Sequence, residues 1–554
     1  MLSLSVHRYK RFCGLVGALL LCSQASDAIA DQDESTATET CAGSDEAEYI
    51  VNQIEIENKP IFDESAEDAI ALHRWANALH IITKPVIIRD RLTFDEGDQV
   101  SEEDIVEAEA ILRARRYLAN AEISTTKDCQ QGTVDVHVET YDNWSLIPTL
   151  SFSRSGGQNN TLIGVREDNL LGLGIRATAR YTEDEQRTGY QLGFSSIVPW
   201  VRHANVFLRI EDNDDGEVYS FVFDKPFYHL NTPTSTFVRA TSVTRVSDIF
   251  QNDLTRNSFE LNAEEFTAAY GWSLTSGNQF TKRLTLGVTY DKADFALANI
   301  SPSTDLSLVP ESRDFLYPWV SYQYAERKIV VMEDIFLINQ PEDINLGWQF
   351  TSRLGIEVEN DSDGLGVHSS LGATKGLAWG DNQLFVMSAR FNAITNGGIE
   401  DLTRFDARFE YFNRRSEIIG YYTRLDSTFS SGQFLDRPIV IDDENGVRGF
   451  PRQYQHGDHR ISASAEVRFY TNYNIYQLFE VGFAAFADTG RAFSGDQALL
   501  NEDPNWLSSV GIGARLFSNK ASNSGVVHID IAKPISDGAN IDSLEVSVQL
   551  RRSF

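Results

Sequence analysis

The chain contains the stretch Asp442-Asp443-Glu444-Asn445-Gly446-Val447-Arg448-Gly449-Phe450, a polar, turn-forming segment with one arginine between small or apolar neighbours. Farther along lies Phe483-Ala484-Ala485-Phe486-Ala487-Asp488-Thr489-Gly490-Arg491, a strand pattern whose alternation points Phe486 and Asp488 to the same face. An arginine that enters a protein interior needs a carboxylate within reach, because an unpaired buried charge is costly and an arginine–carboxylate pair is geometrically specific. We therefore expect Arg448 to pair with Asp488.

These two motifs together resemble the signature of the outer-membrane assembly and translocation superfamily, which includes BamA, TamA and the two-partner-secretion transporters. The matching positions are Val447, Arg448, Gly449 and Phe450, followed by Phe486, Asp488 and Gly490. In that family the first motif is the tip of a long extracellular loop, here 432–458, that folds back into a β-barrel. The second motif lies on the wall that receives it. An ordinary hairpin loop around Asn445-Gly446 is the alternative interpretation.

Around the motifs, from Trp144 to Phe554, alternating segments are separated by Gly, Asn and Asp, which is typical of a transmembrane barrel. In 402–413 and in 459–470, apolar residues occupy one face and charged or small polar residues the other. Soluble sandwiches rarely place several charges on an inward face. We therefore predict a mainly β fold, a transmembrane antiparallel β-barrel over 142–554 with an apolar exterior and a wet lumen.

The number of strands is left open between two values. The pattern places five strands after the loop, which is the number that the resemblance implies, at 458–470, 478–488, 506–518, 524–534 and 541–553. Before the loop it gives about fifteen candidates, against the family's eleven. The resemblance thus implies sixteen strands, and the pattern gives up to twenty.

The chain ends in an alternating apolar segment that includes Leu550 and finishes at Phe554. This ending is similar to the signal by which the barrel-assembly machinery takes up its substrates. The resemblance therefore implies that machinery as a partner for this chain's own insertion.

The N-terminus has the features of an export signal. Basic residues precede an apolar core, and Ala28-Ile29-Ala30 is typical of a cleavage site, so 1–30 is predicted to be a signal peptide. Residues 31–48 are acidic, have few apolar groups and are predicted to be a disordered leader. Cys41 in this leader and Cys129 could form a disulfide in an oxidising compartment, and the sequence leaves this open.

Residues 49–141 are predicted to form a small α/β unit. A strand near Ile50 is followed by a helix that opens at Ser65, a second helix that opens at Ser101, and two strands, the last over 134–138. This order before a barrel is similar to a POTRA domain, the periplasmic module of the superfamily. The resemblance places the unit in the periplasm of a bacterium whose outer membrane holds the barrel.

Composition and missing motifs exclude several functions. A formal charge of −32 argues against nucleic acid as a partner. No motif for a serine hydrolase, a zinc protease or a phosphate-binding loop occurs, so we expect no enzymatic activity, cofactor or metal. The calcium-like segments 212–216 and 361–364 lack the closing Glu and are interpreted as hairpin turns.

Three functional hypotheses follow. The resemblance implies an outer-membrane assembly or translocation factor that captures client polypeptides through the POTRA-like unit and inserts them or passes them through the barrel. A passive or gated channel is the first alternative, and a surface adhesin or antigen is the second.

Overall fold

The computed structural model describes residues 49–551, apart from the segments 62–73, 75–76, 79, 114, 156, 199, 229–231, 276–278, 299–308, 359–363, 398–399, 476–478, 518–525, 537 and 539. The predicted signal peptide, the acidic leader and most of the helix expected from Ser65 lie outside the described residues. No helix among the described residues is long and apolar enough to span a membrane.

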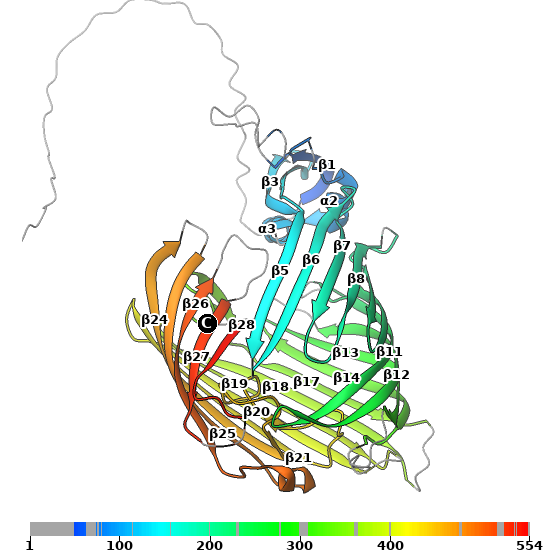
Figure 1. The fold of residues 1–554 in the computed structure, drawn as a ribbon. Coiled ribbons are helices and arrows are strands. Elements are labelled where there is room, and N and C mark those ends of the chain that lie inside the picture. Colours follow the sequence, from blue (N-terminus) through cyan, green and yellow to red (C-terminus); the bar gives the residue numbers. More distant parts are fainter. Residues whose placement is uncertain are drawn as a thin grey trace, which may run out of the picture.

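Twenty antiparallel strands close into one barrel, which is the large body in Figure 1. In sequence order they are β5 (Leu146–Ser155), β6 (Gln158–Leu170), β7 (Ile175–Glu183), β8 (Thr188–Ile197), β9 (Asn205–Asn213), β10 (Gly216–Lys225), β11 (Thr234–Gln251), β12 (Leu254–Thr275), β13 (Phe280–Leu297), β14 (Arg313–Glu326), β17 (Gln349–Ile356), β18 (Val367–Trp379), β19 (Gln383–Thr395), β20 (Leu402–Arg414), β21 (Ile419–Ser431), β24 (His459–Ile475), β25 (Phe479–Phe493), β26 (Leu507–Phe517), β27 (Val526–Pro534) and β28 (Glu545–Arg551).

The mainly β prediction is confirmed, and the expectation of sixteen strands is wrong. The pattern-based count of twenty is correct, with fifteen barrel strands before the 432–458 loop and five after it. An alternating segment left out of the ring would leave unpaired backbone groups at a strand edge in an apolar surrounding. The extra segments therefore widen the barrel and do not stand outside it.

The barrel has an apolar exterior and a polar interior, as the alternation predicts. Phe405, Phe409 and Phe469 are exposed on the outside, whereas Glu466 and Arg468 are buried on the inside. Small side chains such as Ala407 fill the outer positions between the large ones. The exterior is compatible with hydrocarbon, and the charged residues face the lumen.

Two connections fold into the barrel. The first is the loop 432–458, which carries the short strands β22 (Val440–Ile441) and β23 (Gln455–His456). The second joins β14 to β17 and forms a separate hairpin of β15 (Ile329–Glu333) and β16 (Pro341–Asn345). Since the strands alternate in direction, the hairpin lies at the end of the barrel where β5 starts, and the loop lies at the opposite end.

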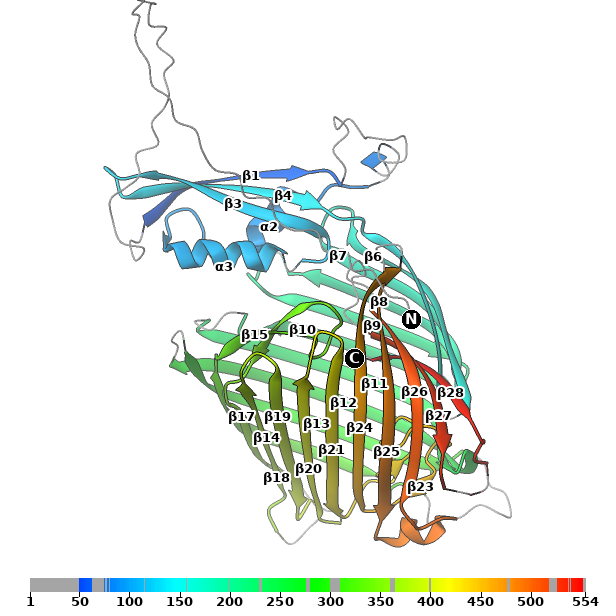
Figure 2. The same ribbon diagram turned by 90° about the vertical axis from the view of Figure 1, so that its left-hand side faces the viewer.

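The α/β unit forms a four-stranded sheet in the order β2-β1-β4-β3, with helices on one face (Figure 2). Its elements are β1 (Tyr49–Lys59), α2 (Pro85–Arg91), β2 (Gln99–Val100), α3 (Glu102–Arg113), β3 (Leu118–Asp128) and β4 (Thr133–Asp142). The helix predicted to open at Ser101 is present as α3, and Ser101 exchanges hydrogen bonds with Asp104 at its start. The helix α2 was not predicted; Ile87 and Ile88 bury one side of its short length.

The α/β unit packs directly on the barrel turns next to β6 and β9. Its hydrophobic core includes Ile197, at the end of β8, and Leu173 packs against that core. The Arg202 guanidinium donates to the backbone oxygens of Leu92 and Phe94 at 2.7 and 3.0 Å. The neighbouring His203 is buried, and loss of solvent, with the positive charges of Arg202 and Arg91 nearby, lowers the pKa of His203 to about 4. The two parts are thus joined by a shared core and by specific hydrogen bonds.

Candidate functional site: a buried ion-pair cluster in the lumen

The structure brings Arg448 and Asp488 together in the lumen. The guanidinium donates from Nε to Asp488 Oδ2 at 2.6 Å and from Nη2 to Oδ1 at 2.8 Å, which is the two-pronged geometry of a strong arginine–carboxylate pair. The Arg448 amide also donates to Asp488 Oδ2, at 3.3 Å. Arg448 and Asp488 are each about 4% exposed, so water screens this pair weakly.

The pair belongs to a larger cluster on the wall formed by β24 to β27. Arg448 Nη1 lies 3.0 Å from Glu466 Oε1 and 3.5 Å from Asp530 Oδ2. Each of these carboxylates binds a second arginine, because Glu466 pairs with Arg468 at 3.0 Å and Asp530 pairs with Arg515 at 2.5 Å. Three guanidinium groups thus share three carboxylates, and the buried cluster balances its charge.

Each position of the second motif has a physical role. The Phe486 ring lies under the Arg448 guanidinium, with 3.4 Å between the central carbon and the ring centroid. Gly490 leaves room for the loop, because a Cβ there would lie 2.9 Å from Ile441 Cδ1 and 3.0 Å from Val447 Cγ2. On one face of β25, Phe486 therefore stacks on Arg448, Asp488 pairs with Arg448, and Gly490 leaves space for the loop.

The first motif is equally well fitted to the lumen. Val447 and Phe450 are fully buried and pack in one cluster with Ile441 and Leu507. Gly449 adopts a left-handed backbone with φ of 88°, and a Cβ at this position would lie 3.0 Å from that of Ala532. The loop tip therefore requires glycine between the buried arginine and the buried phenylalanine.

Two aspartates shape the loop around this tip. Asp442 accepts hydrogen bonds from the amides of Glu444 and Asn445 with Oδ1, at 3.1 and 2.7 Å. Asp443 accepts from the amide of Gly449 at 2.6 Å and from Gln549 Nε2 of β28 at 2.8 Å. The loop is thus preorganised from within and also touches the last strand of the barrel.

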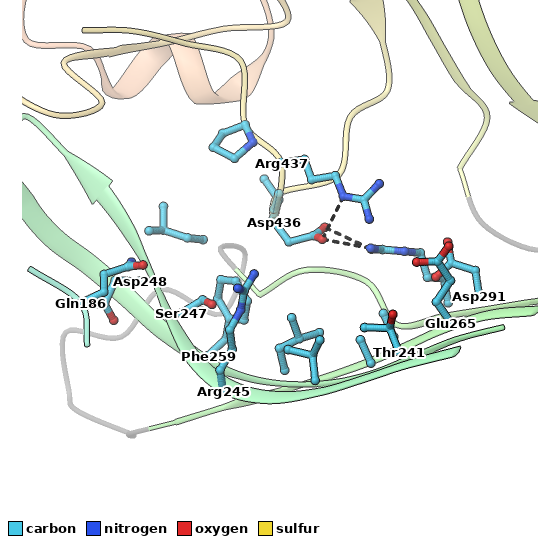
Figure 3. A pocket seen from close by; sticks show the side chains of 18 of the residues that line it. Gln186, Thr241, Arg245, Ser247, Asp248, Phe259, Glu265, Asp291, Asp436 and Arg437 are labelled. Carbon is cyan, nitrogen blue, oxygen red and sulfur yellow. Dashed lines mark hydrogen bonds and ion pairs between the residues drawn. The ribbon is translucent and has the colours of Figure 1, made fainter. Parts of the chain in front are cut away.

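Other contacts hold the loop to the opposite wall. Arg313 of β14 donates two hydrogen bonds to the Asp436 carboxylate, at 3.1 and 3.0 Å. Arg452 donates to Glu185, beyond the end of β7, at 2.7 Å. Figure 3 shows Asp436 and Arg437 over a cavity of about 390 Å³ that is lined from below by Arg245 and Glu265. The loop therefore spans the lumen and leaves polar pockets beneath it.

The ring is weakest where its first and last strands meet. Among the described residues, which exclude 552–554, β28 and β5 pair at Val548↔Arg154 alone, whereas β27 and β28 pair from Val526↔Arg551 to Ala532↔Glu545. Glu545 adds two side-chain contacts across the seam, because its Oε1 lies 3.6 Å from Arg154 Nε and accepts from the amide of Gly157 at 3.1 Å. Few backbone hydrogen bonds therefore need to break for this seam to open.

The other predicted residues fall in three groups. Leu550 is exposed on the outer face of β28, and Phe554 lies outside the described residues. Cys129 is disulfide-bonded, but Cys41 lies outside the described residues, so their pairing stays a prediction. The segment predicted as the last strand of the α/β unit belongs to β4, which lies inside the sheet, so the free edge is β3.

One group of residues could hold a metal ion. Ligand atoms of Glu57, His137 and Glu139 lie within 4.8 Å of one another on the outer face of the α/β sheet. Glu57 is already paired with Lys59 at 2.5 Å, and Glu139 accepts a hydrogen bond from the Tyr141 hydroxyl. These contacts stabilise the carboxylates without an ion, so we assign the group no metal.

Sequence reasoning did not assign Glu466, Asp530 or Arg515 to the site. The alternation places Glu466 on the inward face of its segment, and Asp530 alternates with apolar neighbours in a predicted strand. An isolated carboxylate among apolar residues, at a lumen-facing position, was the available signal. It could not show which guanidinium each carboxylate would meet.

No protein-family model matches the chain. No curated protein matches it. Solved structures similar to it include BamA from Haemophilus ducreyi lacking POTRA domains 1-3, with 11% identity, a TM-score of 0.45, and coverage of 90% of this chain and 83% of that chain.

Two structures of CdiB are also similar. CdiB from Acinetobacter baumannii has 13% identity, a TM-score of 0.46, and coverage of 91% of this chain and 74% of that chain. CdiB from Escherichia coli has 10% identity, a TM-score of 0.37, and coverage of 93% and 92%. These identities and TM-scores are too low to transfer a function, so the function proposed below is based on this chain's own contacts.

Proposed function

We propose that this protein is a non-enzymatic outer-membrane assembly or translocation barrel that captures exported polypeptides through its α/β unit and inserts or passes them at the β28–β5 seam. Two observations together carry the proposal: the loop is held to the wall by the Arg448–Asp488 ion pair, and the seam has one paired position within the described residues. A polypeptide strand can add to a free strand edge by main-chain hydrogen bonds, which tolerate many sequences. The proposal needs no chemical step, since burial of apolar residues in lipid drives insertion.

The placement in an outer membrane is part of the proposal. It is supported by the apolar side chains exposed around the barrel, among them Leu150, Leu192 and Ile512. It is also supported by the export signal in 1–30. The α/β unit, a POTRA-like domain in this proposal, then lies in the periplasm, where exported clients arrive.

Client capture is assigned to β3. Among the described strands, β3 is the long edge strand of the sheet, and its residues Ser124, Thr125 and Thr126 are exposed. The opposite edge, β2, has only two residues. β3 belongs to the α/β unit, which packs on the barrel turns next to β6 and β9. The seam strand β5 directly follows this unit in the chain and is the neighbour of β6 in the ring.

A reversible crosslink tests the role of the seam. Cysteines at Arg154 and Val548, the one paired position, are expected to close the seam by a disulfide in the full-length protein expressed in cells. Outer-membrane protein content should then fall, and a reducing agent should restore it. The control is a cysteine pair at Ile512 and Ile531, which links two strands that are already fully paired. Unchanged outer-membrane content with a closed seam would contradict the proposal.

A photo-crosslinker tests client capture. Placed at Thr126 of β3, it should trap unfolded exported proteins, whereas at Ala110, an exposed position on α3, it should trap few. Equal trapping at both positions would refute capture at the edge. A channel, the alternative function, predicts steady conductance and no dependence on the α/β unit.

A further inference from the structure

The β15–β16 hairpin replaces what could be a short turn. β14 and β17 are adjacent in the ring, and the amide of Glu326 at the end of β14 donates to the oxygen of Trp348 at 2.8 Å. The chain nevertheless leaves the barrel wall after Glu326, forms β15 and β16, and returns to the wall at Trp348. Figure 2 places β15 at the end of the barrel nearest the α/β unit.

The hairpin crosses the lumen. Met332 and Ile335 pack with Leu384, Phe412 and Tyr422, which belong to β19, β20 and β21. Ile338, at the hairpin tip, packs with residues of β24 to β27 in a second cluster: Tyr470, Ala484, Phe517 and Val526. Ile335 and Ile338 are at most 1% exposed. An insert that starts at β14 and ends against β26 and β27 covers much of the barrel's width.

Polar contacts fix the tip against the wall. Asp334 forms an ion pair with Arg414, and its backbone oxygen accepts from the Tyr470 hydroxyl at 2.9 Å. Asn339 Nδ2 donates to Glu480 Oε2 at 2.8 Å. Within the hairpin, Glu342 Oε1 accepts from the amides of Ile335 and Phe336, both at 2.9 Å. A buried segment with these specific partners has one defined position.

The hairpin and the 432–458 loop meet at one carboxylate. Arg468 Nη1 donates to the oxygen of Ile335 at 3.2 Å, and Arg468 Nε donates to Glu466 Oε2 at 3.0 Å. The other oxygen of Glu466, Oε1, lies 3.0 Å from Nη1 of Arg448, at the loop tip. Arg448, Glu466 and Arg468 are all buried. Removing any one of the three leaves the buried cluster of three guanidinium groups and three carboxylates with one uncompensated charge.

We infer that the β15–β16 hairpin is a stopper at the α/β-unit end of the lumen, and that Glu466 couples the stopper to the loop at the other end. Displacing either insert weakens the ion pairs that hold the other. The lumen therefore opens by a concerted release of both inserts. This inference concerns the lumen alone and holds whatever the barrel carries.

Conductance of the purified full-length barrel in a planar lipid bilayer tests the stopper. Replacing residues 327–347 by Asn-Gly joins Glu326 to Trp348 through a turn suited to antiparallel neighbours. The variant should show steady conductance several times that of the parent protein. Retention of the folded electrophoretic mobility of the unheated protein shows that the barrel has formed. A folded variant with the parent's conductance would overturn the stopper.

Hydrogen exchange tests the coupling. In Arg448→Ala, the amides of Ile335 and Phe336 should exchange at least about tenfold faster, although Arg448 touches neither residue. The matched control is Arg404→Ala, which breaks a lumen ion pair with Asp406 on the same strand. Unchanged exchange in the hairpin of a folded Arg448→Ala protein would overturn the coupling.

A second variant probes the coupling from the hairpin and does not touch the cluster. Asn339→Ala removes the hydrogen bonds to Glu480 and Thr471 at the hairpin tip. The amide of Gly449, which donates to Asp443 in the loop, should then exchange faster. Faster exchange confined to 329–345 would show two independent inserts and would overturn the coupling.

Discussion

The wall from β24 to β27 and the seam between β28 and β5 are built by opposite means. The wall binds Arg448 of the loop through three carboxylates, Glu466, Asp488 and Asp530, and all four side chains are almost completely buried. The seam, only one strand farther around the ring, has a single paired position in the described part of the chain and a half-exposed Arg154. β28 therefore has a firmly held wall on one side and a weakly paired junction with β5 on the other.

A closed barrel can thus keep one labile junction between two strands. Backbone pairing alone would make every junction similar, so the wall gains its extra rigidity from buried side chains that pair with one another. Asp443 links the two regions, because it holds the loop tip and also accepts from Gln549 of β28. The loop therefore supports the strand next to the seam without adding hydrogen bonds to β5.

Loss of Arg448 should lower the stability of the barrel more than any other change considered. Arg448→Ala leaves the buried Asp488 carboxylate without its guanidinium partner and is expected to lower the free energy of unfolding by about 3–5 kcal/mol. The measurement is the temperature at which the folded electrophoretic mobility is lost in detergent. Arg404→Ala, whose partner Asp406 is partly exposed, should change it far less. Equal effects of the two variants would show that burial of the cluster adds nothing to the wall.

Filling the space at Gly490 should have the next largest effect. In Gly490→Ala the new Cβ meets Ile441, Ser462 and Val447 within 3.0 Å, and overpacking of this kind costs about 1–3 kcal/mol. Protease cleavage in 442–453 should increase as the loop is pushed away from the wall. The control is Gly364→Ala, where the nearest atom would lie 3.3 Å away. An intact loop in Gly490→Ala would mean that the motif glycine is not needed for its seating.

Acid should loosen the joint that holds the α/β unit beside the seam. The pKa of His203 lies at about 4 in the folded protein, below its ordinary value, so the unfolded state binds more protons between those two values. Stability of the joint should fall as the pH drops from about 6.5 towards 4. Hydrogen exchange of 92–95 measures this. His203→Asn, which tolerates the left-handed backbone at this position, should remove the pH dependence. A pH dependence that persists in this variant would assign it to another group.

The smallest effect is expected at the seam itself. Glu545→Ala removes the ion pair with Arg154 and the hydrogen bond to Gly157, and a partly exposed pair contributes about 0.2–1 kcal/mol. The temperature at which the folded mobility is lost should shift by only a few degrees. A shift as large as that of Arg448→Ala would show that the seam is held as strongly as the wall, and would contradict the difference between them.

Much of the fold could be predicted because side-chain alternation is a local property. The inward position of Glu466 and the outward position of Phe405 follow from a period of two along each strand. The strand count followed from the same pattern, and the resemblance to a sixteen-stranded family was the less accurate guide. In the α/β unit, the hydroxyl of Ser101 and the carboxylate of Asp104 marked the start of α3 three residues apart.

The site was predictable only in part. Arg448 and Asp488 could be paired from the sequence because each occupies a motif, but Asp530 and Arg515 lie on strands whose spatial order depends on closure of the ring. The inward fold of the β15–β16 hairpin had no signature either, because its apolar residues could equally have formed two more strands of the wall. Its destination depends on Phe412, Tyr470 and Phe517, which come from three different strands.

The sequence by itself determined that the chain forms strands with one apolar and one polar face, and that one glycine-flanked arginine needs a carboxylate. Alternation and charge balance act over a few residues and need no partner from elsewhere in the chain. The tertiary structure was needed to show that all twenty segments join one ring, that Glu466 is shared by Arg448 and Arg468, and that the described parts of β28 and β5 pair at one position. These features depend on how the curvature of the whole barrel brings distant strands into register, which no local pattern specifies.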